Sequence, residues 1–294
     1  MIKTENIEKH FDDASKDYDK YKYYNNSVKS SFSVRQELIL NYIEKNVSKS
    51  SRILDCGCGT GEVLLSIAKK GYVIDGFDIS NNMVDISQSK IQKHNIQGVH
   101  IWKDNICEFE TKQKYDVIIV MGVFQYLTKS LQQQAYQQIK KALKSNGLLI
   151  ISYGNSIFGL FTFNKHTVEF FKDYIFPLHT WSDTKEVLES NISSLLTYSS
   201  KGRKKGKKSE TAHGYLPLYL TNPFTIKDEL QSYGFKQQSL KFFHFHALPP
   251  LIKDRLKFPK EFDINSFAME QKYTESWLGY FMAYQFLTFS RKVK

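Results

Sequence analysis

Short apolar runs alternate with amphipathic stretches over the first half of the chain. The runs end near residues 56, 77, 102, 120 and 153, and each has the length of a buried strand. The stretches between them carry apolar residues at helical spacing, as Met83, Val84 and Ile91 do. Strands that alternate with helices form a parallel sheet with helices on both faces. The pattern therefore predicts a doubly wound α/β fold.

Three glycines follow the first apolar run at every second position. Gly57, Gly59 and Gly61 precede a helical pattern that starts at Glu62. Glycine lets the backbone come close to a ligand because it has no Cβ. The amide groups and the positive dipole end of the helix face the same place. We expect this turn to hold a ligand with a carboxylate or a phosphate; the alternative is a tight turn without a ligand.

Polar residues also follow the second and third runs. Asp78 ends the second run about 20 residues after the glycine turn, where a doubly wound fold places its ribose-binding carboxylate. Ser80 is a suitable N-cap for the next helix, and the third run leads to Asp104 and Asn105. Open α/β sheets bind ligands at the carboxyl ends of their strands. We therefore expect these residues to line one site.

The glycine spacing distinguishes between possible ligands. A dinucleotide fingerprint is Gly-x-Gly-x-x-Gly, whereas this chain has Asp55-x-Gly57-x-Gly59-x-Gly61. This motif resembles the first motif of the class I S-adenosylmethionine-dependent methyltransferases. The resemblance covers residues 33–153 and extends more loosely to residues 221–234 and the last two strands. It implies a Rossmann-like, seven-stranded sheet of order 3-2-1-4-5-7-6 with an antiparallel last strand.

The resemblance also implies a cofactor and the residues that hold it. The cofactor is S-adenosylmethionine, the product is S-adenosylhomocysteine, and no metal is expected. By resemblance, an N-terminal helix closes over the cofactor and brings Tyr18 to its amino acid end; the alternative is an aromatic stripe that only packs on the core. The residues implied to bind the cofactor are Tyr18, Asp55, Gly57, Gly59, Gly61, Asp78, Ile79, Met83, Asp104, Asn105, Ile106, Met121 and Gly122.

The chain is predicted to have four segments. Residues 1–32 form a cap, residues 33–153 the cofactor-binding core, residues 154–220 an inserted lid, and residues 221–294 the rest of the core with a small insertion at 251–275. The first part of the lid is rich in aromatic residues, which suits the wall of a small-molecule pocket. An accessory helical layer elsewhere is the alternative. We expect a helix within 128–145 that stops at Asn146-Gly147, and strands at 148–153, 239–247 and 280–290.

Charge and cysteine content narrow the partners. The net charge of the 294-residue chain is +11, and residues 201–208 hold six of the positive side chains, which leaves +5 elsewhere. A nucleic-acid footprint over the whole surface is therefore not indicated. The basic run reads as a solvated loop or as a loop that recruits a phosphate-bearing acceptor. Three cysteines without partners suit a reducing compartment, and neither a signal peptide nor an 18-residue apolar run is present. We expect a cytoplasmic protein that does not bind membranes.

Sequence motifs identify residues of the cofactor site but give only weaker candidates for the acceptor site. Methyl transfer needs an acceptor placed in line with the methyl group, and a hydroxyl acceptor also needs a base. His244 is a candidate base because it alternates with His246 on one face of the predicted sixth strand; a structural histidine is the alternative. By resemblance, Gln125, Tyr126 and Tyr153 end strands near the transferred methyl, and we expect them to contact the acceptor. His246 is a further candidate for this contact, because it shares a strand face with His244.

Exclusions favour a small-molecule acceptor. The sequence after the fourth run, Met121-Gly122-Val123-Phe124, lacks the Pro-Pro-aromatic motif of enzymes that methylate nucleobase amines. No Pro-Cys pair for cytosine C5 chemistry and no acidic cluster for metal-assisted catechol methylation stands out. We expect O-methylation of a polar metabolite such as a sugar or a nucleotide-activated sugar. The alternatives are a tRNA or other RNA methyltransferase that uses residues 201–208, and a cofactor-binding sensor without catalysis.

Overall fold

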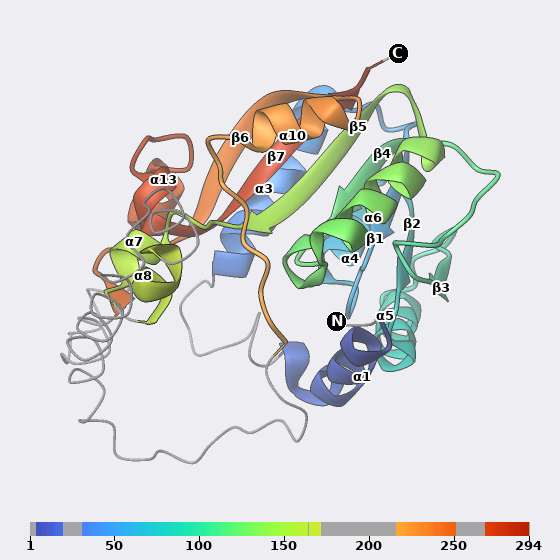
Figure 1. Cartoon of the computed structure of the whole chain (residues 1–294). Coiled ribbons are helices and arrows are strands. Elements are labelled where there is room, and N and C mark those ends of the chain that lie inside the picture. The colour runs from blue at the N-terminus through green and yellow to red at the C-terminus, as the bar shows by residue number, and fades with distance from the viewer. Residues whose placement is uncertain (1–3, 20–30, 164, 172–215, 251–267, 294) are drawn as a thin grey trace.

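The structure is a computed structural model that describes residues 4–19, 31–163, 165–171, 216–250 and 268–293. One seven-stranded sheet of order β3-β2-β1-β4-β5-β7-β6 runs through it (Figure 1). Its strands are β1 (Arg52–Cys56), β2 (Val73–Asp78), β3 (Ile101–Lys103), β4 (Tyr115–Val120), β5 (Leu143–Gly154), β6 (Phe235–Phe245) and β7 (Ala283–Lys292). β1 to β5 pair in parallel, and β7 pairs antiparallel with both β5 and β6. The predicted fold class and strand order are confirmed.

Helices cover both faces of this sheet. They are α1 (Thr4–Ala14), η1 (Ser15–Asp17), α3 (Ser31–Asn46), α4 (Glu62–Lys69), α5 (Asn81–Lys93), η2 (Phe124–Tyr126), α6 (Lys129–Ala142), α7 (Gly159–Thr162), α8 (Lys165–Phe170), α10 (Ile226–Ser232) and α13 (Gly279–Met282). Figure 1 shows α6 and α10 on one face and α3 on the other. None of the helices in the described ranges is both long enough and apolar enough to cross a membrane.

The position of β4 in the middle of the sheet explains its continuous apolar sequence. Val117 and Ile119 belong to the core under α3 and α4, whereas Ile118 and Val120 belong to the core under α6 and α10. Successive side chains of a strand point to opposite faces, so a strand covered on both sides needs apolar residues at every position. The continuous apolar run is thus explained by a strand buried between two helical layers.

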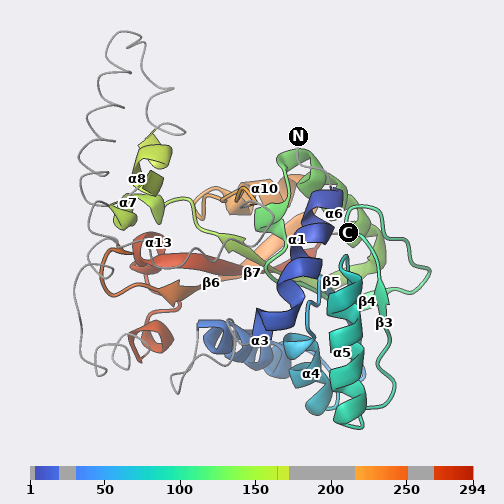
Figure 2. The ribbon, with the colours of Figure 1, turned by 90° about the horizontal axis from the view of Figure 1, so that it is seen from below.

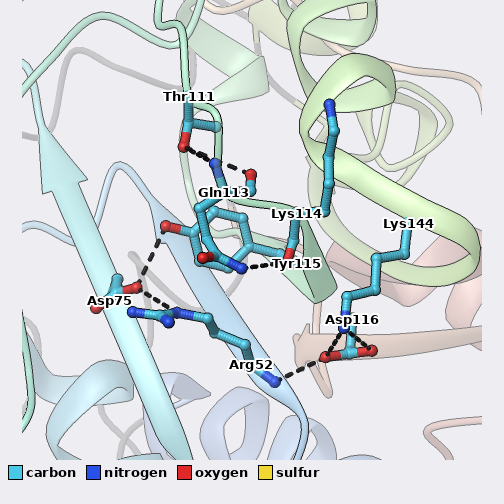
Figure 3. Close-up of polar contacts among 8 residues, drawn as sticks. All are labelled: Arg52, Asp75, Thr111, Gln113, Lys114, Tyr115, Asp116 and Lys144. Carbon is cyan, nitrogen blue, oxygen red and sulfur yellow. Dashed lines mark hydrogen bonds and ion pairs between the residues drawn. The ribbon is translucent and has the colours of Figure 1, made fainter.

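A polar network ties together the amino ends of the strands, away from the expected site (Figure 3). Arg52 at the start of β1 donates to the buried carboxylate of Asp75 in β2 at 3.1 Å, and the Tyr115 hydroxyl of β4 donates to the same oxygen at 3.2 Å. Lys144 of β5 pairs with Asp116 at 2.9 Å. These contacts cross four strands and help to fix the alignment of their opposite, carboxyl ends.

Some predicted boundaries differ from the observed ones. α6 ends at Ala142 and β5 begins at Leu143, which pairs with Tyr115, so the expected helix stop at Asn146-Gly147 lies inside the strand. Asn146 has a φ of 59°, and the β4–β5 ladder shifts register nearby. Pairing of Leu143 with its neighbouring strand therefore overrides the local turn signal.

The two C-terminal strands also start elsewhere. β6 begins at Phe235 rather than at residue 239, because Phe235 already pairs with Lys292 of β7. β7 begins at Ala283 rather than at residue 280, because α13 occupies the three preceding positions. The basic run at 201–208, most of the expected lid and residues 251–267 lie outside the described residues.

Candidate functional site

The glycine turn after β1 bends back over the end of β2. The amides of Gly57 and Cys58 both donate to the carbonyl of Phe77, at 2.8 and 2.9 Å. The φ angles of Gly57, Gly59 and Gly61 are 77°, 53° and 81°, in the left-handed region that glycine adopts most readily. The alternating glycine spacing therefore reflects the conformation that this bend requires.

The three glycines have different surroundings. A Cβ on Gly57 would lie 2.3 Å from Cγ2 of Val123, and a Cβ on Gly61 would lie 2.2 Å from Oγ of Ser87. A Cβ on Gly59 would meet no atom within 4 Å, and Gly59 lines a cavity. Gly57 and Gly61 thus allow close packing of the protein, whereas Gly59 leaves space in the cavity.

Asp78 connects the glycine turn to the next helix. Its carboxylate accepts hydrogen bonds from the amide of Gly59 at 2.8 Å and from the amide of Ser80 at 3.0 Å. Burial raises the pKa of Asp78, and these two amides act in the opposite direction. Because each carboxylate oxygen has two acceptor sites, Asp78 can still accept hydrogen bonds from a ligand. Ser80 is the N-cap of α5 as predicted, and its Oγ accepts from the Met83 amide at 3.2 Å.

Two buried charged residues lie behind the turn. Burial raises the pKa of Asp55 in β1 to about 7, while Arg35 of α3 lowers it and Asp78 raises it. Asp55 Oδ1 has no hydrogen-bond partner within the described part of the chain. Nη1 of Arg35 lies 3.8 Å from where a Cβ on Gly122 would stand. Arg35 was missed by the sequence reasoning, because an arginine among helical residues carries no motif that marks it.

A cavity with about 650 Å³ of atom-free space lies between α1 and the carboxyl ends of β1, β2 and β4. Eleven of the thirteen predicted cofactor residues line it: Tyr18, Gly57, Gly59, Asp78, Ile79, Met83, Asp104, Asn105, Ile106, Met121 and Gly122. The other two, Asp55 and Gly61, are not on its wall. Ile7, Phe11 and Tyr126 add apolar and aromatic surface.

The N-terminal segment closes this cavity from one side, and Figure 2 shows α1 beside α5. Asp12 of α1 accepts hydrogen bonds from Oγ of Ser80 and, at 3.4 Å, from the amide of Asn82. A carboxylate is favoured there because the first amides and positive dipole end of a helix attract negative charge. Phe11 packs edge-on against Tyr126, with ring centroids 5.2 Å apart.

A second contact joins this segment to the glycine turn. Asp19 accepts a hydrogen bond from Oγ1 of Thr60 and forms an ion pair with Lys90 of α5. Lys90 also pairs with Glu62 at the start of α4. The cap is thus held by both helices that begin at the site, and Tyr18 lies between its two attachment points.

The residues predicted to contact an acceptor are divided by the structure. Tyr126 lines the cavity, and the buried Gln125 beside it accepts a hydrogen bond from Gln285 of β7 at 2.9 Å. Tyr153 is not brought to the cavity wall. It is buried in the core, where its hydroxyl lies 2.7 Å from that of Tyr136 on α6.

His244 lies near the end of β6, and His246 follows one residue after the strand. Their rings stack with centroids 5.3 Å apart and planes 18° from parallel. Tyr284 of β7 meets His244 edge-on at 5.4 Å. Neither histidine is on the cavity wall. Burial raises the pKa of Tyr284 to about 12, and the Coulombic effect of Tyr126 raises it further. Tyr284 thus contacts His244 and interacts electrostatically with the cavity-lining Tyr126, a role that no sequence motif indicated.

Comparison with known families gives one match that covers more than half of the chain. A family described as "methyltransferase domain" matches residues 47–211. The match begins just before β1 and includes the glycine turn, Asp78 and the Asp104-Asn105 region.

Curated relatives match over part of their length. The ubiquinone biosynthesis O-methyltransferase of Rickettsia prowazekii is 28% identical over 56% of this chain and 64% of its own. The malonyl-[acyl-carrier protein] O-methyltransferase of Halalkalibacterium halodurans is 31% identical over 52% of this chain and 56% of its own. The chain therefore spans between about half and two thirds of the length of these two relatives.

A solved structure shares the fold over nearly all of both chains. It is the magnesium protoporphyrin IX methyltransferase of Synechocystis with bound SAH, which has a TM-score of 0.60 and 14% sequence identity. The alignment covers 99% of this chain and 100% of that one. The likeness extends over both the strands that carry the glycine turn and the C-terminal strands.

Proposed function

The chain belongs to the class I S-adenosylmethionine-dependent methyltransferases, and from this premise we propose that it transfers a methyl group from S-adenosylmethionine to a small molecule. The observation that carries the proposal is the cavity beside Gly59 and Asp78. Its residues fit the cofactor. Gly59 leaves open space where any other residue would place a Cβ, and Asp78 keeps unused acceptor capacity for ribose hydroxyls.

The charges behind the glycine turn suit the amino acid end of the cofactor. Asp55 has a buried oxygen without a hydrogen-bond partner among the described residues, and such an atom is costly unless a ligand satisfies it. Asp55 is behind the cavity wall rather than on it, and an ammonium group bound in front of it would favour the ionised carboxylate. Arg35 lies near Gly122 on the cavity wall and would complement a carboxylate. We assign the amino acid end to this side.

The opposite side of the cavity suits the adenine ring. Asp104 already accepts from the amide of Asn105 at 2.8 Å and from the indole of Trp102 at 3.1 Å, which fixes its orientation. A carboxylate held this way can accept a hydrogen bond from an amino group of the ring. Ile106 and Met83 supply apolar surface for the ring faces.

When bound, the cofactor supplies a methyl group on a positively charged sulfur. The chain places the acceptor, excludes water and removes a proton if the acceptor is a hydroxyl. We propose that His244 accepts that proton and that Gln125, Tyr126 and His246 contact the acceptor. Tyr153 has no place in this proposal, because its hydroxyl already pairs with Tyr136 inside the core.

The proposed reaction is O-methylation of a hydroxyl-bearing metabolite. Both curated relatives described above are named as O-methyltransferases, and this supports the oxygen as the acceptor atom. A sugar or nucleotide-activated sugar stays a prediction from the sequence. The RNA alternative depends on the run at 201–208, which lies outside the described residues.

The test is a transfer assay with a labelled methyl donor and separate pools of acceptors. The pools are hydroxylated small metabolites, nucleotide sugars and total cellular RNA. We expect label in a small-molecule pool and binding of S-adenosylhomocysteine by calorimetry. Label in RNA alone would contradict the acceptor class, and binding without transfer to any pool would favour the sensor. Loss of both binding and transfer in Gly59→Val, with the variant still folded at the assay temperature, would tie the activity to this cavity.

A further inference from the structure

The ladder between β6 and β7 is interrupted at His244. Phe243 pairs with Gln285 and Phe245 pairs with Ala283, so the register is the same on both sides of His244 and no residue is inserted. His244 has a φ of 61°, in the left-handed region. A non-glycine residue in this conformation costs about 1 kcal/mol or more and persists only where its surroundings enforce it.

A buried carboxylate satisfies the backbone at this point. The amide of His244 donates a hydrogen bond to Oε1 of Glu270, and Glu270 is only 3% exposed. Burial of a carboxylate is costly unless charge-assisted hydrogen bonds compensate for the lost water. Two features that are unfavourable alone, a left-handed histidine and a buried glutamate, thus occur together and compensate each other.

Glu270 reaches this place because β6 is the outer strand of the sheet. The chain that follows residue 267 runs along its edge, where the amide of Phe242 donates to the carbonyl of Thr274 at 2.6 Å. Covering an edge needs only backbone contacts of this kind. The Glu270 carboxylate is directed at the one residue in the strand with a left-handed backbone, which simple edge protection does not require.

The backbone conformation of His244 determines where its ring lies. The ring stacks on His246 and meets the Tyr284 ring edge-on. Gln285, next to Tyr284 in β7, is hydrogen-bonded to Gln125, and Gln125 precedes Tyr126, which is on the wall of the cavity. Contacts through Tyr284 and its neighbour Gln285 thus connect His244 to the residues beside the cavity.

We propose that Glu270 is a positioning residue: its carboxylate holds the backbone of His244 in the left-handed conformation and so directs the imidazole toward a hydroxyl acceptor bound beside Tyr126 and Tyr284. This inference rests on the proposed function. The acceptor O–H bond breaks and its proton goes to the imidazole. An O–C bond forms as the methyl leaves the sulfur, which keeps the electron pair of the broken C–S bond.

The first test does not need an active enzyme. Nuclear magnetic resonance of the full chain, loaded with S-adenosylhomocysteine, measures the ring resonances of His244 and His246 and the hydrogen exchange of the His244 amide. In Glu270→Ala we expect both ring resonances to shift and the His244 amide to exchange at least about 10-fold faster, since it loses a charge-assisted bond. Glu270→Gln keeps an acceptor oxygen and should largely restore the wild-type spectrum. Unchanged ring resonances in Glu270→Ala would overturn the proposal.

The second test uses the acceptor identified by the transfer assay. We expect Glu270→Ala to lower kcat by about 10- to 100-fold, because a displaced base loses much of its contribution, with the affinity for S-adenosylhomocysteine unchanged. Glu270→Gln should recover most of kcat. The matched control is Glu275→Ala, which removes an exposed carboxylate from the same segment, where it pairs with Lys241. Equal kcat in Glu270→Ala and Glu275→Ala would overturn the proposal.

The two proposals fail in different ways. If the wild-type chain transfers no methyl group, the proposed function fails, while the resonance experiment still decides whether Glu270 orients His244. If transfer occurs and Glu270→Ala changes only thermal stability, the residue merely covers the edge of β6 and the positioning role is wrong.

Discussion

The proposed cofactor side and the proposed acceptor side of this molecule are built in different ways. The cofactor side takes its carboxylates, Asp78 and Asp104, from positions at or just past the ends of β2 and β3. The acceptor side joins η2, β6, β7 and the 268–272 segment, which are far apart in the chain. Short sequence motifs therefore specify most of the cofactor side, whereas the acceptor side forms only after the C-terminal strands have paired.

The difference has a structural origin. The glycine turn must adopt positive φ angles and must leave room for Ser87 and Val123, so few residue types are allowed there. On the acceptor side, Glu270 needs only to be a carboxylate at the right point in space. Requirements on the backbone leave a readable pattern, and requirements on one side chain do not.

The largest expected effect contrasts two glycines of the turn. Gly61→Val should lower the free energy of unfolding by about 3 kcal/mol or more, because its Cβ would collide with Ser87 and its φ is 81°. Gly59→Val should lose only about 1–2 kcal/mol from backbone strain but should no longer bind S-adenosylhomocysteine. Urea unfolding and calorimetry measure the two quantities. Similar stability of both variants would contradict the distinction between a packing glycine and a cavity glycine.

The next effect concerns the ribose contact. Asp78→Ala should weaken the binding of S-adenosylmethionine by about 3 kcal/mol, roughly a hundredfold in Kd, because it removes charge-assisted hydrogen bonds. The change also removes the contacts to the amides of Gly59 and Ser80. Asp78→Asn, which keeps one acceptor oxygen, should lose less. Calorimetry that shows unchanged affinity in Asp78→Ala would mean that this carboxylate does not hold the ribose.

A pH dependence should reveal the buried acid behind the turn. The pKa of Asp55 is about 7 in the folded chain and about 3.9 in an unfolded one. The folded state therefore binds more protons between these values, and stability falls as pH rises. From pH 5 to pH 7 the unfolding free energy should drop by about 2 kcal/mol more in the wild type than in Asp55→Asn. Equal pH slopes in urea unfolding would contradict a raised pKa.

The attachment of the N-terminal cap should have a smaller effect. Asp12→Ala removes a carboxylate from the start of α5 and should speed the dissociation of S-adenosylhomocysteine by about fivefold, since such contacts contribute about 1 kcal/mol. Stopped-flow displacement measures the rate. Glu5→Ala, an exposed carboxylate on the same helix, is the control. Equal dissociation rates in the two variants would show that α1 does not retain the ligand.

The smallest effect separates Tyr153 from the acceptor residues. Tyr153→Phe should lower the unfolding free energy by about 1 kcal/mol, because the hydroxyl of Tyr136 loses its buried partner. KM for the acceptor and kcat should stay the same, whereas Tyr126→Phe, on the cavity wall, should change KM. A change in KM with Tyr153→Phe would place that residue back among the acceptor contacts.

The sequence by itself determined the fold class, the strand order through its family resemblance, and most of the cofactor-side cavity. Gly57, Gly59, Gly61 and Asp78 could be found because bends and strand ends limit the residues that can occupy them, and these limits act over a few neighbouring positions. Ser80 was found for the same reason, since a helix N-cap depends on local geometry.

Only the tertiary structure decided the start of β5, the burial of Asp55 with Arg35 near it, and the meeting of Glu270 with His244. Leu143 joins a strand because Tyr115 of the neighbouring strand pairs with it. The left-handed backbone of His244 is not indicated by the alternating sequence pattern of β6. Such features arise from contacts between segments distant in sequence, and each segment's own pattern is compatible with several partners.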